Sequence, residues 1–200
     1  MGRLSRERGL LGSAISYALA EASLVTPQLL SRPTPCFGWD LETLLDHVVD
    51  SIRVLHRAIT SGGGGAAPDS AARPGLDPVA RLRRETARLV AASASPRSAD
   101  GAVSIGDREL SARVVTVAGA MEIAVHGWDI SVACGGDRLI PSSLAAVLLP
   151  IAPLLITAET RPGLFADPVR LARPARAGDE LVAFLGRQPD LLTPPEPRNA

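Results

Sequence analysis

Two short segments far apart in the sequence carry residue types that bind divalent metals. Glu122 and His126 stand four residues apart in the segment MEIAVHGWD, and His47 stands in the earlier segment DHVVD. Residues four apart on a helix share a face, so the Glu122 carboxylate and the His126 imidazole are expected to point the same way. Two histidines and a glutamate with one coordination position left open are typical of catalytic zinc and of some other divalent metals. We therefore predict a metal site formed by His47, Glu122 and His126.

Helical geometry also separates the remaining histidine from this set. His56 lies nine residues after His47, which places it about 180° away around the same helix. Asp50 and Asp129 each follow a candidate ligand by three residues, and each is a candidate to accept a ring N–H and fix the tautomer of its histidine. The alternative that these residues bind no metal stays open. A glutamate and a histidine four residues apart recur by chance, and most buried histidines are hydrogen-bonded core residues.

Arginines and a cysteine near the first histidine offer further candidates. Arg53 and Arg57 lie six and ten residues after His47 and could bind a carboxylate of a substrate or of a thiol cofactor. The competing interpretation of both is an exposed, charged face of the helix. Cys36 is interpreted as a buried structural thiol and not as a fourth ligand, because an open metal site needs only three ligands from the protein.

Hydrophobic spacing, caps and breakers predict the elements that must hold these residues. Helices are expected over residues 5–30, 40–61, 78–94, 111–134, 141–159 and 178–185, with a short hairpin over residues 103–110. Asp40 and Asp77 are expected to cap the second and third helices. Gly135 closes the fourth helix, and Pro150 and Pro153 should kink or split the fifth.

Length and composition favour one helical domain. The chain has 200 residues, of which 46% are apolar but only 3% aromatic, so its core must be built from small and branched aliphatic side chains. We expect a single domain over residues 1–190, followed by a frayed tail at 191–200. The glycine-rich segment 61–76 is expected to be a mobile loop.

The charge balance argues against several classes of partner. With 21 basic and 21 acidic residues, the chain has no net charge to attract nucleic acid or an anionic membrane. No apolar run approaches the ~20 residues that span a bilayer, and two cysteines are too few for a disulfide framework. We expect a cytoplasmic protein that acts on a small molecule, either as a monomer or as a homodimer.

Three motifs resemble those of one known family. Residues 33–49, which include PTPCFGWD and LLDHVV, resemble the opening motif of the mycothiol-dependent maleylpyruvate isomerase N-terminal domain. Residues 121–131 resemble the second motif of that family. Residues 181–189 resemble the ending of an actinobacterial branch that is described as metal-binding. The larger group is the DinB-like superfamily, and the resemblance covers nearly the whole chain.

The resemblance implies an all-α fold, namely a DinB-like four-helix bundle with a short hairpin and a small C-terminal extension. His47, Glu122 and His126 match the metal-ligand positions of the family. Zn²⁺ is the expected metal, with Ni²⁺ or another divalent ion as alternatives, and mycothiol is implied as a thiol cofactor. In the isomerase a metal-bound thiolate adds to a conjugated alkene, allows rotation and leaves, and related members transfer the thiol to electrophiles.

Three functions follow as alternatives. The leading one is a thiol-dependent transferase or isomerase that acts on a small molecule. The second is a thiol-independent cyclase or isomerase of secondary metabolism, and the third is a non-catalytic, metal-stabilised binding protein. Maleylpyruvate itself is not the expected substrate, because the isomerase carries a further C-terminal domain that this chain is too short to contain.

Overall fold

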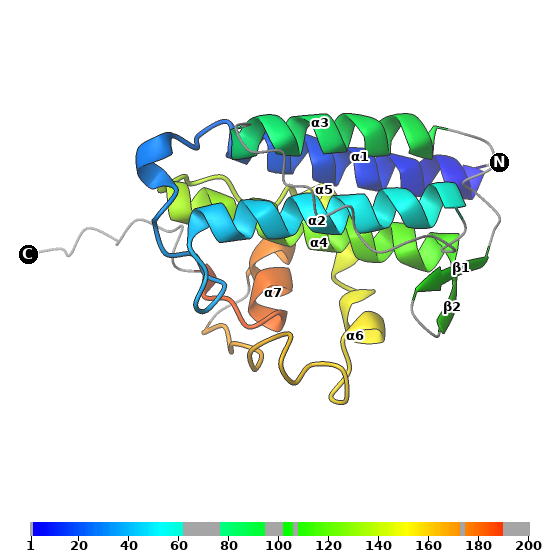
Figure 1. Cartoon of the computed structure of the whole chain (residues 1–200). Helices are drawn as coiled ribbons and strands as arrows, with labels where there is room; N and C mark the ends of the chain where they lie inside the picture. Colours follow the sequence, from blue (N-terminus) through cyan, green and yellow to red (C-terminus); the bar gives the residue numbers. More distant parts are fainter. Residues whose placement is uncertain (1, 62–76, 95–101, 106–107, 173–174, 190–200) are drawn as a thin grey trace, which may run out of the picture.

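Four long helices form the body of the molecule (Figure 1). The computed structural model describes residues 2–61, 77–94, 102–105, 108–172 and 175–189. The bundle consists of α1 (Gly2–Ala22), α2 (Leu41–Ser61), α3 (Pro78–Ser93) and α4 (Ala112–Cys134). The predicted all-α, DinB-like bundle is confirmed. Residues 62–76 of the predicted mobile loop and the predicted tail at 191–200 lie outside the described residues.

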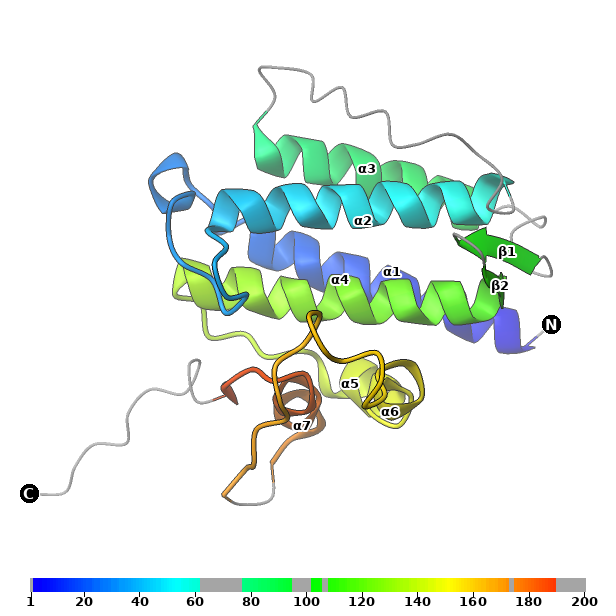
Figure 2. The same ribbon diagram turned by 60° about the horizontal axis from the view of Figure 1, so that its bottom comes forward.

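Two helices run in one direction and two in the other. The views in Figures 1 and 2 show α2 parallel to α3, with α1 and α4 running the opposite way. Ion pairs confirm the parallel pair, because Asp46 of α2 meets Arg81 near the start of α3, and Arg53 meets Glu85 further along both helices. Figure 2 places α4 between α2 on one side and the C-terminal elements on the other.

Local sequence explains where the two site-bearing helices begin and end. Asp40 Oδ1 accepts the Thr43 N–H at 2.9 Å, and Ser111 Oγ accepts the Val114 N–H at 3.3 Å, so α2 and α4 both have side-chain N-caps. Gly135 takes φ 73° after α4, a left-handed conformation that glycine adopts without strain. The apolar residues that recur every three or four positions along α2 are all buried: Leu41, Leu44, Val48, Ile52 and Leu55.

The first helix is shorter than the sequence predicted. A helix over 5–30 was expected, but α1 ends at Ala22 and a 3₁₀ turn, η1 (Pro27–Leu29), follows it. The ring of Pro27 disfavours the helical conformation at the preceding residue, and Thr26 accordingly takes φ −121° and ψ 160°. The predicted end at residue 30 overlooked this effect of Pro27.

The chain after α4 forms a separate layer of short helices. The predicted split by Pro150 and Pro153 is confirmed, since α5 (Ser142–Leu148) and α6 (Ala152–Leu155) replace one helix over 141–159. The end is four residues earlier than predicted, because Ile156 leaves the helical region at φ −120° and ψ 93°. The predicted last helix is present as α7 (Ala177–Phe184), and Figure 2 shows α5, α6 and α7 on the side of α4 that faces away from α2.

The predicted hairpin is also present at the start of α4. Its strands, β1 (Ala102–Ile105) and β2 (Arg108–Ser111), pair antiparallel, with Ala102 opposite Ser111. It lies at the end of the bundle where α4 begins, away from the middle of that helix (Figure 1). None of the described helices is long and apolar enough to cross a membrane.

Candidate metal centre

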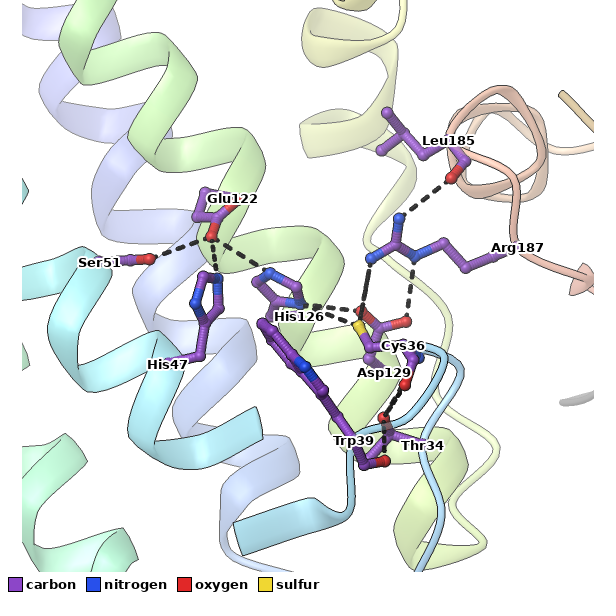
Figure 3. A network of polar contacts seen from close by, with 10 residues as sticks. All are labelled: Thr34, Cys36, Trp39, His47, Ser51, Glu122, His126, Asp129, Leu185 and Arg187. Atoms are coloured by element: carbon purple, nitrogen blue, oxygen red, sulfur yellow. Dashed lines mark hydrogen bonds and ion pairs between the residues drawn. The ribbon is translucent and has the colours of Figure 1, made fainter. Parts of the chain in front are cut away.

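Three potential metal ligands from two helices converge on one point between α2 and α4 (Figure 3). Glu122 Oε1 lies 2.9 Å from His47 Nε2 and 3.2 Å from His126 Nε2. All three donor atoms lie within 4.8 Å of one another. His47 comes from α2, while Glu122 and His126 come from successive turns of α4. The structure therefore brings together the three residues that the sequence singled out.

Glu122 is held as a carboxylate by its neighbours. Its Oε1 accepts hydrogen bonds from Ser51 Oγ at 3.1 Å and from the two histidines. Burial alone would raise the pKa of Glu122, but the hydrogen bonds with His126 and His47 and the charges of both rings lower it well below its usual value. A carboxylate oxygen between two imidazole nitrogens offers a divalent cation three ligand atoms once the rings have released the protons that they share with Glu122.

The ring of His126 is oriented by a buried carboxylate. His126 Nδ1 lies 2.9 Å from Asp129 Oδ2, and the Asp129 side chain is completely buried. Burial would raise the pKa of Asp129, but the hydrogen bond from His126 and the charge of Arg187 lower it, so the group is a carboxylate that accepts the Nδ1–H. This leaves His126 Nε2 directed at Glu122, the arrangement found for metal-ligating histidines.

The same contacts set the protonation of His126 when no metal is bound. Burial alone would lower the pKa of His126, but its hydrogen bonds with Asp129 and other polar neighbours and the charge of Glu122 raise it well above the usual value. A metal that binds Nε2 must therefore displace a proton, as metal ligation by a histidine generally does.

Arg187 fixes Asp129 from the C-terminal side. Its Nε donates to Oδ1 at 3.2 Å and its Nη2 donates to Oδ2 at 2.9 Å, while Nη1 donates to the carbonyl of Leu185 at 3.1 Å. Two parallel hydrogen bonds between a guanidinium and a carboxylate define the geometry of both groups. The chain after α7 thus contributes to the site through Asp129.

Cys36 takes part in this outer network and is only half-buried. Its Sγ donates to Asp129 Oδ2 at 3.3 Å, lies 3.8 Å from His126 Nδ1 and accepts from Arg187 Nη2 at 3.6 Å. Cys36, His126 and Asp129 form a second group of potential ligands. That group surrounds the opposite ring nitrogen of His126, where Arg187 already pairs with the carboxylate.

The segment before α2 supplies the contact that positions His47. The Trp39 ring packs against the His47 ring with centroids 4.7 Å apart, and the two histidine rings meet edge-on at 5.0 Å. The Thr34 hydroxyl donates to the Trp39 carbonyl at 3.0 Å and so closes the turn that carries the tryptophan. Trp39 therefore restricts the orientation of the His47 imidazole.

Other residues predicted for the site lie outside this cluster. Asp50 accepts from Arg53 Nη1 at 3.1 Å, and Arg53 Nη2 also lies 3.6 Å from Glu85 of α3. Among the described residues, neither Arg57 nor His56 has a side-chain hydrogen bond or ion pair with the cluster. In the described part of the chain, Asp50, Arg53 and Arg57 therefore make no side-chain hydrogen bond or ion pair with the candidate ligands, and the roles suggested for them have no support from such contacts.

Sequence reasoning missed two members of the network. Ser51 stands four residues after His47, and this spacing on α2 was a signal for a shared face. Arg187 lies in the tail segment that resembles the family ending, but its spacing gave no indication that it would pair with Asp129. A buried carboxylate on a helix needs a cationic partner, and that need was the only available hint.

The donor set fits a divalent metal and can be approached from outside. Two imidazole nitrogens and one carboxylate oxygen are the ligand types of catalytic zinc, which leaves one position for water or substrate. A cavity of about 150 Å³ borders Glu122 and His126 on the side of the C-terminal segment. Two of the three candidate ligands, Glu122 and His126, thus border a space that a small molecule can enter.

Comparisons with known proteins point the same way. A model of the mycothiol maleylpyruvate isomerase N-terminal domain matches residues 11–131, which include the three candidate ligands. Two uncharacterized proteins of Mycobacterium tuberculosis, from strains CDC 1551 and H37Rv, are each 30% identical to the chain over 162 residues. Those alignments cover 79% of this chain and 85% of each relative. No solved structure matches the chain.

Proposed function

Because the chain belongs to the mycothiol maleylpyruvate isomerase N-terminal domain family, we propose that it is a metal-dependent enzyme. Its metal would be held by His47 Nε2, Glu122 Oε1 and His126 Nε2. The single observation that carries the proposal is the convergence of these three donor atoms within 4.8 Å. Zn²⁺ is the metal that the donor set favours, and Ni²⁺ has the same ligand preferences closely enough to compete.

The metal would supply Lewis acidity, which deprotonates a coordinating thiol and lowers the pKa of a bound water to about 7. The protein's own residues prepare that position. Asp129 keeps His126 Nε2 directed inward, Ser51 holds Glu122, and Trp39 restricts His47. Each of these contacts limits movement of a ligand and therefore reduces the reorganisation needed on binding.

The proposed reaction is transfer or isomerisation that depends on a mycothiol-type thiol and acts on a small molecule. Family membership supports the thiol, and the cavity beside Glu122 and His126 supports a small-molecule substrate. The alternatives are a thiol-independent cyclase or isomerase and a non-catalytic binding protein. Each would give a different result when metal content and thiol dependence are measured. The predicted cytoplasmic location and homodimer stay predictions.

Metal content tests the proposed ligands. Purified protein should bind about one equivalent of Zn²⁺ by elemental analysis, and His47→Ala and His126→Ala should each lose it. His56→Ala is the matched control, because His56 lies on the same helix as His47 and outside the cluster. Stoichiometric metal that survives both ligand substitutions would refute the proposed centre.

A thiol-dependence assay separates the two enzymatic readings. The metal-loaded protein is incubated with an electrophile such as a haloarene or a conjugated enone, with and without mycothiol. A protein-catalysed rate that requires mycothiol and disappears in His47→Ala supports thiol chemistry. Turnover without thiol would favour the cyclase or isomerase reading, and saturable metal binding without any turnover would favour the binding protein.

A further inference from the structure

The cavity beside the candidate metal centre has two walls of different origin. One wall is a face of α4, made by Ala118, Met121, Glu122, Val125 and His126. The other comes from the chain after residue 131, where the family match ends, and is made by Leu155, Ile156, Phe165, Leu185 and Arg187. The wall that carries Glu122 and His126 thus lies within the part of the chain that matches the family. The opposite wall lies in the C-terminal segment, outside that match.

The facing wall is almost entirely apolar. Its single charged residue, Arg187, uses Nε and Nη2 on Asp129 and Nη1 on the Leu185 carbonyl. Its guanidinium also stands over the Phe165 ring at 6.0 Å from the centroid. A carboxylate placed against this wall would lose its water without gaining a free cation, which is costly. An uncharged, apolar group would meet Leu155, Ile156 and Phe165 at no such cost.

The size of the cavity limits the group further. Its volume is about 150 Å³. A cavity of this size lined by aliphatic and aromatic side chains can hold one molecule of about the size of benzene. Larger substrates would have to extend out of the cavity.

We propose that this cavity is a substrate-specificity pocket that takes a compact, uncharged apolar group, such as an aromatic ring or a short branched alkyl chain. The pocket would select apolar electrophiles over dicarboxylates. The placement of the substrate's reactive end beside Glu122 and His126 rests on the proposed function, whereas the binding of the apolar group does not.

Methionine labelling gives a direct reporter. The chain has two methionines, Met1 and Met121, and Met121 lines the cavity. In metal-free protein labelled with [methyl-¹³C]methionine, toluene should shift the Met121 signal saturably and leave the Met1 signal unchanged. Succinate, a dicarboxylate, should shift neither signal. The absence of a toluene shift, or an equal response to succinate, would overturn the inference.

Matched variants locate the binding. Ala118→Phe fills the cavity from α4 and should weaken toluene binding at least tenfold. Val114→Phe places the same ring on an exposed position of the same helix and should leave toluene binding unchanged. If Ala118→Phe does not fold, Leu155→Glu on the short α6 outside the bundle should give the same tenfold loss. Unaltered toluene binding in a folded cavity variant would overturn the pocket.

Adding Zn²⁺ to the same samples separates this inference from the proposed function. Toluene binding without metal binding would support the pocket and count against the metal centre. Metal binding without toluene binding would support the centre and overturn the pocket.

Discussion

At the scale of single residues, the candidate centre depends on which aspartate faces a histidine. Asp50 and Asp129 occupy the same position relative to His47 and His126, three residues further along a helix. Asp129 is buried and contacts His126 Nδ1 at 2.9 Å, whereas Asp50 is exposed and contacts Arg53. Identical spacing therefore produces an orienting carboxylate in one helix and a surface ion pair in the other.

This contrast gives a matched pair of variants. Asp129→Asn should weaken Zn²⁺ binding about 10–100-fold, because the neutral amide no longer fixes the His126 ring or balances Arg187. Asp50→Asn should leave the affinity unchanged. Isothermal titration of metal-free protein measures both affinities, and an equal loss in the two variants would show that Asp129 has no orienting role.

At the scale of helices, the site requires α4 to be fixed against its neighbours. On one side α1 approaches so closely that a Cβ atom built on Gly127 would lie 3.0 Å from Ala18 Cα and 3.1 Å from the Tyr17 ring. Gly127 follows His126 directly, so the candidate ligand stands next to a close contact between the two helices. The tight contact restrains the backbone that carries His126.

Substitution of this glycine should therefore be unfavourable despite better helix propensity. Gly127→Val is expected to lower the free energy of unfolding by about 1–3 kcal/mol, since the added carbons have no space. Gly12→Ala in α1 is the control, because a Cβ atom there meets nothing within 4 Å. It should raise stability by up to about 1 kcal/mol. Urea unfolding measures both, and a stabilised Gly127→Val would contradict the close packing.

A buried charge cluster fixes α3 against α2. Glu85 is 5% exposed and pairs with Arg84, Arg88 and Arg53. Burial would raise the pKa of Glu85, but the charge of Arg88 and the contacts with the other arginines lower it below its usual value. A lowered pKa in the folded state means that the stabilisation is present above the unfolded-state pKa and is lost as pH falls through the folded value.

The cluster predicts the pH dependence of stability. Glu85→Gln should destabilise the protein by about 1–3 kcal/mol near neutral pH, and the difference from the unsubstituted protein should shrink below about pH 4.5. Glu42→Gln changes an exposed residue of α2 and should have little effect. Urea unfolding from pH 3.5 to 7 tests both, and a pH-independent effect of Glu85→Gln would rule out a contribution from its charge.

At the scale of the whole molecule, a metal held between α2 and α4 would couple site occupancy to folding. A ligand that binds only the folded state stabilises it by about 2.7 kcal/mol at 100 times its Kd. For a chain of 200 residues this corresponds to a rise in Tm of roughly 5–10 °C. A metal at this place would join two helices that are far apart in sequence, so its removal should be visible in global unfolding.

Thermal unfolding with and without chelator checks this coupling. Zn²⁺ should raise the Tm of the unsubstituted protein and of His56→Ala, and it should leave His47→Ala unchanged. A metal-dependent shift of the same size in all three proteins would mean that the stabilising metal binds elsewhere.

Local patterns determined much of the architecture and the candidate ligands. The spacing of Glu122 and His126 and the caps Asp40 and Asp77 depend on neighbours in sequence, so local patterns were sufficient to predict them. The end of α1 at Ala22, ahead of Pro27, was not predicted, although the effect of Pro27 on Thr26 is equally local.

Only the tertiary structure decided which distant groups meet. The pairing of Asp129 with Arg187 joins residues 58 positions apart, and the contact of Trp39 with His47 depends on how one turn folds back. No local periodicity encodes such contacts, because they arise from the packing of whole helices and of the C-terminal layer. The sequence therefore determined three ligand types on two helices, and the packing decided their convergence, their orienting partners and the apolar wall that faces them.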